Sequence, residues 1–364
     1  MNLIGYRLAN QQLAQKRFNR AADLVSWLGA VQAQDYAGAK WAVGQRLPAS
    51  TDAELDQAFA EGAILRTHVM RPTWHFVSPS DIRWMLALTA PRVNAAMAYY
   101  QRQHELDTAF FARSHKLMRK ALEGGRELTR QELASALQRA GLVKPEASNH
   151  GQRMGHIMAR AELDAVVCSG ARRGKQFTYA LLDERAPHAK LRSRTEALAE
   201  LVLRYFTSHG PATLADFVWW SGLTVKDART GLDAVTSKLL SDDFGGRTYW
   251  MSTVIPTVQN SARTAYLLPN YDEYVVAYAD RQAIAGPPGA KSLAARGSVL
   301  LNYTILLDGR IAGTWKRSVG KAGVTIEANT FSLITNSQRD QVIGAAERYG
   351  AFLGLEAHVS FTSL

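Results

Sequence analysis

The sequence predicts an α+β protein in which three helical units, each closed by a hairpin, precede a region of short strands. Up to about residue 260, apolar side chains mostly recur at helical spacing, and after about residue 262 strand-like runs dominate. Of the 364 residues, 47% are hydrophobic, which is enough to bury the cores of several domains. We therefore predict three tandem winged helices followed by a small C-terminal antiparallel β-barrel.

Residues 1–106 form the first predicted winged helix. An apolar stripe that begins with Leu24 predicts one amphipathic helix, and residues 36–45 predict a second, short helix with Asp35 as its cap. Residues 64–78 then predict a basic pair of strands. Helices followed by such a hairpin are typical of a winged helix.

The same order of elements recurs in residues 107–190 and again in residues 191–260. In the first of these, residues 150–164 predict a recognition helix, and residues 166–182 predict a strand, a basic turn and a second strand. A pattern that repeats at about 80 residues predicts tandem units of one kind.

Residues 261–364 form the predicted barrel. Asp308-Gly309 lies between two alternating apolar runs and is a strong hairpin signal. One late helix is predicted over residues 336–353, and residues 271–274 are candidates for a packed polar network.

Charge favours an anionic partner. Lys and Arg total 43 against 32 acidic residues, a formal net charge of +11, which suits nucleic acid although it also fits a protein that is merely basic. The single cysteine, Cys168, excludes an internal disulfide and argues against a thiolate metal site. Its apolar neighbours predict a place in the core.

Several classes of function lose support. The chain contains no nucleophile elbow and no phosphate-binding glycine loop, so we predict no nucleotide cofactor. Its His, Asp and Glu residues lack ligand spacing, so we predict no metal and no other cofactor. Neither a leader nor an apolar run of membrane-spanning length is present, which predicts a cytoplasmic protein without a membrane partner.

Two amides stand where the first two helices meet, at Gln32 and Gln34. Residues two apart share a face only in an extended segment, so the two side chains converge if the first helix ends near Val31. Together they can hold one water without carrying charge, whereas the simpler interpretation is that both face solvent. Asp35 is a better general base than an amide, although we favour its interpretation as the cap of the next helix.

Four blocks of sequence carry a resemblance to a known family. These are VQAQDYAGAKWAVGQRL, RPTWHFVSPSDIRWM, LLPNYDEYVVAYADR and DGRIAGTWKR, and in this order they resemble the AlkZ/YcaQ family of winged-helix DNA glycosylases. In that family the Q-x-Q motif marks the AlkZ-like branch and carries catalysis, which implies a catalytic role for Gln32 and Gln34. The resemblance likewise implies three winged helices beside a C-terminal β-barrel.

The predicted DNA contacts lie on hairpins. Strand alternation places Arg71, Thr73 and His75 on one face, although His75 is equally well explained as a histidine packed beneath the hairpin. The basic turn at residues 172–175 suits phosphate, as solvated turns in general do. The full set is Arg66, His68, Arg71, Thr73, His75, Arg172, Arg173, Lys175, Lys316 and Arg317.

The resemblance to this family implies a monofunctional DNA glycosylase of base excision repair. Its substrates would be alkylated purines of the N7-alkylguanine and N3-alkyladenine type, with interstrand crosslinks as a further candidate, in damaged double-stranded DNA. A base alkylated at a ring nitrogen is already cationic and leaves easily, so neutral amides suffice. We expect a monomer. The alternative is a non-enzymatic winged-helix DNA-binding protein or transcriptional regulator, which would prefer one operator sequence.

Overall fold

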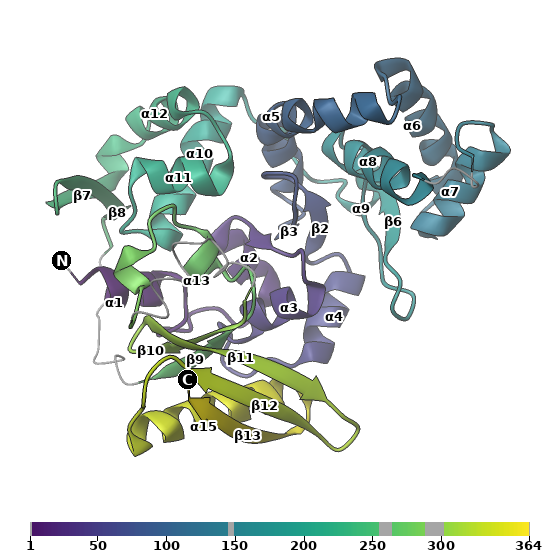
Figure 1. Cartoon of the computed structure of the whole chain (residues 1–364). Helices are drawn as coiled ribbons and strands as arrows, with labels where there is room; N and C mark the ends of the chain where they lie inside the picture. The colour runs from purple at the N-terminus through teal and green to yellow at the C-terminus, as the bar shows by residue number, and fades with distance from the viewer. Residues whose placement is uncertain (1, 145–148, 255–263, 288–301, 364) are drawn as a thin grey trace. The chain divides into compact units, whose positions relative to one another are not determined.

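The computed structural model describes residues 2–144, 149–254, 264–287 and 302–363, and it has the predicted α+β class (Figure 1). The chain divides into two compact units. Unit 1 comprises Met1–Asp56, Ala199–Trp220 and Thr224–Leu364, and unit 2 comprises Gln57–Leu198 and Ser221–Leu223. The predicted boundary between residues 260 and 261 lies outside the described residues. Among the described residues, no helix combines the length and the apolar character that a membrane span requires.

The N-terminal part of unit 1 is helical. Its elements are α1 (Leu3–Asn10), α2 (Ala21–Leu28), β1 (Val31–Gln32), α3 (Tyr36–Gly44) and the start of α4 (Asp52–Ala60). Helix α2 ends earlier than the predicted position near Val31, because Gly29 adopts a φ of 81° and turns the chain. The predicted second helix is confirmed, with Asp35 as its cap.

A second helical group of unit 1 leads into a hairpin. It contains α10 (Arg194–His209), α11 (Leu214–Ser221), α12 (Val225–Asp233), a short 3₁₀ turn (Thr236–Lys238), β7 (Leu239–Phe244) and β8 (Arg247–Ser252). Strands β7 and β8 pair antiparallel, and Ala212 forms an isolated bridge with Trp250 of β8. The predicted order of helices followed by a hairpin is therefore present here.

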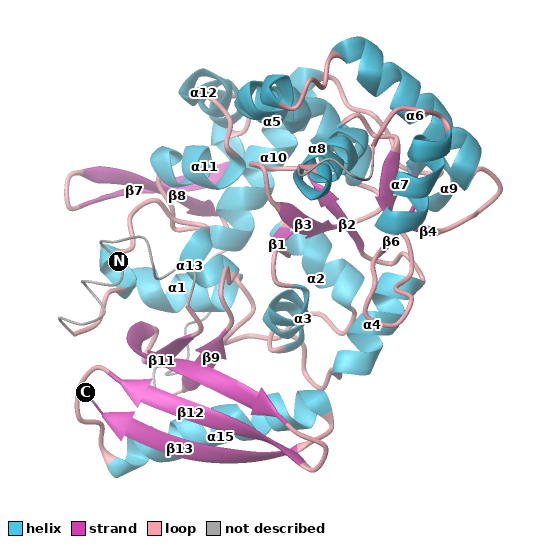
Figure 2. Ribbon diagram, turned by 45° about the vertical axis from the view of Figure 1, so that its right-hand side comes forward, coloured by secondary structure: helices cyan, strands magenta, loops and turns pink. Residues whose placement is uncertain are grey.

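The C-terminal part of unit 1 is built on a five-stranded sheet. Its elements are β9 (Ala265–Leu268), α13 (Glu273–Val276), a 3₁₀ turn (Gln282–Ile284), β10 (Thr304–Leu307), β11 (Arg310–Val319), β12 (Gly323–Thr330), α15 (Asn336–Leu353) and β13 (Glu356–Ser363). The strands follow the order β13-β12-β11-β10-β9. Figure 2 shows β11, β12 and β13 of this sheet side by side. Asp308 and Gly309 both have positive φ, 52° and 72°, and form the predicted hairpin turn between β10 and β11.

The sheet corrects the predicted antiparallel barrel. Among the described residues it does not close on itself, and β12 and β13 run parallel. Parallel neighbours need a long crossover, which helix α15 supplies between them. The late helix was predicted, but the sequence does not state which strands it would bring together.

Unit 2 contains two hairpins and α5, the longest of the described helices. Its elements are the end of α4, β2 (Leu65–His68), β3 (Trp74–Val77), α5 (Ile82–Gln103), α6 (Thr108–Leu122), β4 (Leu128–Thr129), α7 (Arg130–Arg139), α8 (His150–Leu163), β5 (Val167–Ser169), β6 (Thr178–Leu181) and α9 (Leu182–Arg185). Strands β2 and β3 pair antiparallel, and a separate sheet has the order β4-β6-β5. Both hairpins were predicted.

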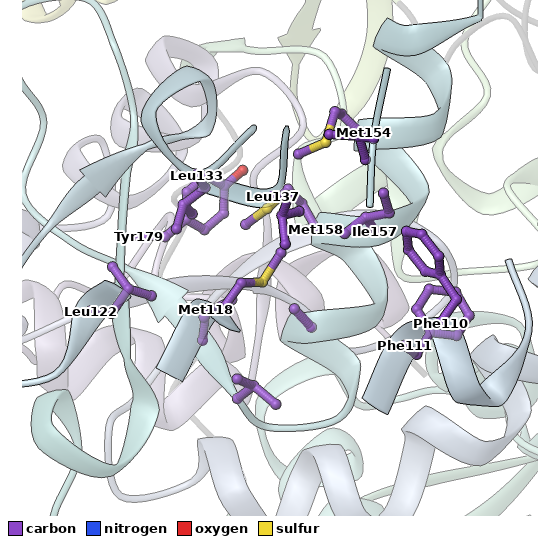
Figure 3. Packing of buried hydrophobic residues seen from close by; sticks show 14 of the residues in the cluster. Phe110, Phe111, Met118, Leu122, Leu133, Leu137, Met154, Ile157, Met158 and Tyr179 are labelled. Carbon is purple, nitrogen blue, oxygen red and sulfur yellow. The ribbon is translucent and has the colours of Figure 1, made fainter. Parts of the chain in front are cut away.

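The core of unit 2 lies between α6, α7, α8 and the β4-β6-β5 sheet. Phe110 and Met118 from α6 pack with Leu133 of α7 and Ile157 of α8 (Figure 3). Cys168 on β5 is completely buried, as predicted, and burial raises the pKa of its thiol to about 12. Its side chain therefore serves packing rather than chemistry at neutral pH.

Candidate active site

The two glutamines of the Q-A-Q segment lie in different environments. The Gln32 side chain is only 5% exposed, whereas Gln34 is exposed to solvent. The extended backbone of β1 ends at Gln32, and the next residues turn toward the start of α3. The two glutamines therefore differ in their exposure to solvent, with Gln32 buried and Gln34 at the surface.

Asp35 closes this segment and caps α3. One of its carboxylate oxygens accepts a hydrogen bond from the Gly38 backbone N–H at 3.1 Å. The other accepts a hydrogen bond from the hydroxyl of Tyr303, and the pKa of Tyr303 is raised by burial and by this bond to a carboxylate. The predicted cap is thus confirmed, with a distant tyrosine as a second partner.

Tyr303 belongs to a polar chain on the C-terminal sheet. Arg317 Nη2 donates to the Tyr303 hydroxyl at 3.2 Å, and Arg317 Nη1 donates to the Tyr349 hydroxyl on α15. Arg317 is accordingly half-buried, while the adjacent Lys316 is exposed. Alternation along β11 places the two basic residues that were predicted to contact DNA on opposite faces, and Lys316 is the more exposed of the two.

The predicted polar network at residues 271–274 is present and buried. The Asp272 carboxylate receives two hydrogen bonds from the Arg46 guanidinium, at 2.8 and 2.7 Å, and the two side chains are 0% and 1% exposed. The neighbouring Glu273 accepts a hydrogen bond from the Gln32 backbone N–H at 2.9 Å. Gln32, before α3, and Arg46, after it, are therefore both bound by adjacent residues of the C-terminal region, Glu273 and Asp272.

Sequence reasoning did not connect Glu273 or Tyr303 with the glutamines. They lie 241 and 268 residues beyond their partners Gln32 and Asp35. No local spacing carries such a pairing. The only available signal was the position of Glu273 within a block that also carried the family resemblance.

In unit 2, Arg66 and His68 are enclosed rather than presented to a ligand. They are 8% and 6% exposed. The Arg66 guanidinium lies 4.3 Å from the centroid of the Trp74 ring, and the His68 ring nitrogen Nδ1 contacts the buried carboxylate of Glu162. Both side chains belong to the polar interior between β2, β3 and α8, because partners distant in sequence surround them.

The expected polar face of Arg71, Thr73 and His75 does not form as a unit. His75 is 0% exposed, and its Nδ1 lies 3.0 Å from the Thr73 carbonyl oxygen. Arg71 is half-buried at the turn with a φ of 54°, and Thr73 is also half-buried. The structure therefore has a histidine packed beneath the hairpin, which was the alternative interpretation.

The turn between β5 and β6 is basic and open. Arg173 and Lys175 are exposed around Gly174, whose φ is 59°, and Arg172 is half-buried. Arg173 donates to Glu132 at 2.9 Å, an exposed ion pair that water and salt weaken. Of the predicted DNA contacts in unit 2, this turn is the most accessible.

No set of three or more His, Cys, Asp or Glu side chains is arranged to hold a metal ion in the ranges that the structure describes.

Replacing Asp35 with Asn separates its two possible roles. Because Asn caps helices well but cannot take a proton, we expect the single-turnover rate of base release to stay within about threefold of the parent. Asp107→Asn is the matched control, since Asp107 caps α6 in the same way. A loss of about 100-fold or more, in Asp35→Asn alone, would identify Asp35 as the general base.

The class of protein follows from the Q-x-Q segment in this α+β chain together with the comparison with known families. The family described as "DNA glycosylase AlkZ-like" matches residues 25–352, and the chain belongs to this family.

A curated relative and a solved structure extend this result. The chain is 24% identical over 331 residues to an "Interstrand DNA cross-link repair glycosylase" of Streptomyces sahachiroi, which covers 86% of each protein. The solved structure of Streptomyces sahachiroi DNA glycosylase AlkZ matches with a TM-score of 0.79 and 20% identity, over 99% of this chain and 98% of that one. At this identity the structural match establishes the fold.

Proposed function

We propose that this protein is a DNA glycosylase that hydrolyses the N-glycosidic bond of alkylated purines, of the N7-alkylguanine and N3-alkyladenine type, in base excision repair. Interstrand crosslinks through such positions are a further proposed substrate, which the name of the Streptomyces relative supports. The observation that carries the proposal is the Q-A-Q segment of a family member, with Gln32 anchored by Glu273 and Gln34 open to solvent.

The proposed reaction needs a positioned water more than a strong base. In an N7-alkylated guanine the electron pair of the C1′–N9 bond leaves with the purine and neutralises its positive charge. The oxygen of water bonds to C1′ and its proton passes to solvent. Gln32 and Gln34 orient that water, and their dipoles favour the charge that develops on the sugar. Such a site has no need to protonate the leaving base.

The monofunctional character of the enzyme is also a proposal. Cleavage of the DNA strand by a glycosylase requires an amine nucleophile. Lys40 lies on α3 close to the Q-A-Q segment in sequence, but it is buried and donates to Asp52 and Asp56 at 2.7 and 2.8 Å. Because the Lys40 amine is engaged by two carboxylates, it is not positioned as a free nucleophile, which supports an intact abasic strand as the product.

The strand orders support winged helices as the DNA-binding frame. In unit 2 the order β4-β6-β5, with α6 before β4, α7 and α8 between β4 and β5, and a basic turn between β5 and β6, follows the plan of a winged helix. In unit 1 the Ala212 bridge to β8 and the β7-β8 hairpin repeat it. We propose that the protein binds duplex DNA as a monomer in the cytoplasm through these units.

Incubation with a duplex that contains one N7-methylguanine tests the proposed function. The expected product is a strand that breaks at that guanine only after treatment with alkali, together with free 7-methylguanine. A duplex with unmodified guanine is the control. Binding to one preferred operator without base release would favour a transcriptional regulator instead.

The basic turn of unit 2 makes a separate prediction. A plot of log affinity for duplex DNA against log salt concentration has a negative slope, to which each phosphate contact contributes about −0.9. In an Arg173→Ala, Lys175→Ala variant the slope is expected to become less steep by about 2, because two exposed basic side chains are removed. Arg20→Ala is the control, since Arg20 is also exposed but lies on another part of the chain. An unchanged slope would place the phosphate contacts elsewhere.

A further inference from the structure

Glu273 is a buried acidic residue that was not among the predicted catalytic or DNA-binding residues. It is the first residue of α13 and is 1% exposed. Its Oε1 accepts a hydrogen bond from the Gln32 backbone N–H at 2.9 Å. Its Oε2 accepts a hydrogen bond from Trp220 Nε1–H at 2.9 Å and lies 3.5 Å from His209 Nε2.

A buried charge at this place calls for a reason other than stability. Moving a carboxylate out of water is costly, and an apolar group of similar size often stabilises a fold as well or better. The side chain of Glu273 differs from an apolar group because both of its oxygens accept hydrogen bonds, which fixes where the two donors point. Here one of those donors is the backbone of Gln32.

The backbone at Gln32 lies in a short extended segment. Helix α2 has already ended at Leu28, and β1 contains only Val31 and Gln32. The 2.9 Å hydrogen bond from the Gln32 N–H to Glu273 Oε1 connects this backbone to α13. The Glu273 carboxylate therefore sets the direction of the peptide that precedes the Gln32 side chain.

We propose that Glu273 is a positioning residue for base release. It holds the backbone of Gln32, so that the side-chain amide of Gln32 is fixed relative to the DNA. This inference rests on the proposed function. Glu273 touches neither water nor substrate in the reaction and acts through Gln32. Positioning of this kind affects rate strongly, because a displacement of about 1 Å can lower a rate about 100-fold.

The test is Glu273→Gln, which keeps the size of the side chain. Its amide oxygen can accept from only one of the two donors, while its NH₂ faces the other. The single-turnover rate constant for release of 7-methylguanine is expected to fall about 10- to 100-fold, while the Kd for the damaged duplex changes less than about threefold. A loss of binding and rate in parallel would indicate a merely structural role and overturn the inference.

Asp216→Asn is the matched control for loss of a buried charge. Asp216 is 2% exposed, lies in the same unit and accepts from the backbone N–H groups of Thr213 and Ala279 at 2.9 Å. It is expected to lose stability as Glu273→Gln does but to keep the parent rate constant, measured on the folded protein. Equal rate losses in the two variants would contradict a specific role for Glu273.

Hydrogen exchange at the Gln32 amide tests the inference without a substitution, should Glu273→Gln fail to fold. With selective ¹⁵N-glutamine labelling, the Gln32 N–H is expected to exchange at least about 100-fold more slowly than the N–H of Gln34. Equal exchange would overturn the inference. If the parent enzyme releases base but Glu273→Gln keeps its rate, only the inference fails, whereas a parent that releases no base removes the proposed function itself.

Discussion

A variant with both Gln32→Ala and Gln34→Ala is expected to release 7-methylguanine at least about 100-fold more slowly than the parent in single turnover. Removing one positioned polar group that acts on a developing charge costs about 100- to 1,000-fold in other hydrolases, and this variant removes two. The measurement is the release of 7-methylguanine from duplex DNA under conditions of excess enzyme.

The single variants separate chemistry from folding. Gln34 is exposed, so Gln34→Ala should leave the unfolding midpoint unchanged, and any loss of rate then reports on the reaction. Gln32 is buried, so Gln32→Ala is expected to cost about 1–3 kcal/mol of stability as well. Gln57→Ala is the control, since Gln57 is an exposed glutamine on α4 whose side chain donates a hydrogen bond to Glu61 at 2.8 Å. A double variant that retained the parent rate would exclude the glutamines from catalysis.

The largest effect on stability is expected from Asp272→Ala. This change leaves the Arg46 guanidinium, 1% exposed, without the carboxylate that binds both of its Nη atoms. Breaking a buried ion pair by removing one partner costs about 3–5 kcal/mol, because the remaining charge stays buried. The Tyr274 backbone N–H and the Gln45 amide lose the same acceptor. Urea unfolding followed by tryptophan fluorescence measures the loss.

Asp23→Ala provides the comparison for this prediction. Asp23 pairs with Arg20 at 3.8 Å, and the two side chains are 49% and 73% exposed. Such a surface pair contributes about 0–1 kcal/mol, so its removal should barely move the midpoint. Equal effects of Asp272→Ala and Asp23→Ala would show that the buried pair does not hold α3 to the C-terminal region.

The sequence predicts what depends on neighbouring residues. The cap at Asp35, the Asp308-Gly309 turn and the helix-and-hairpin order are local, and the structure has all three. Burial of the predicted DNA contacts Arg66, His68 and His75 depends on partners such as Glu162, which lies 94 residues beyond His68. Periodicity places a side chain on one face of a strand but does not tell what will cover that face.

The candidate site likewise combines a feature that the local sequence predicts with one that depends on long-range contacts. The positions of the glutamines follow from a short motif, whereas the carboxylate that holds Gln32 follows only from the folding of the whole of unit 1. The parallel pairing of β12 with β13 has the same origin, since it depends on where α15 returns the chain. Long-range contacts of this kind leave no periodic trace in a single sequence.

The span between Gln32 and its anchor also has a consequence during synthesis. A ribosome makes Gln32 early, but Glu273 leaves the exit tunnel only after most of the chain has been translated. A nascent or truncated chain that stops before residue 273 therefore contains the Q-A-Q segment but lacks the carboxyl group that accepts the Gln32 N–H. If Glu273 positions Gln32 as proposed, a chain that stops before residue 273 is expected to release no base.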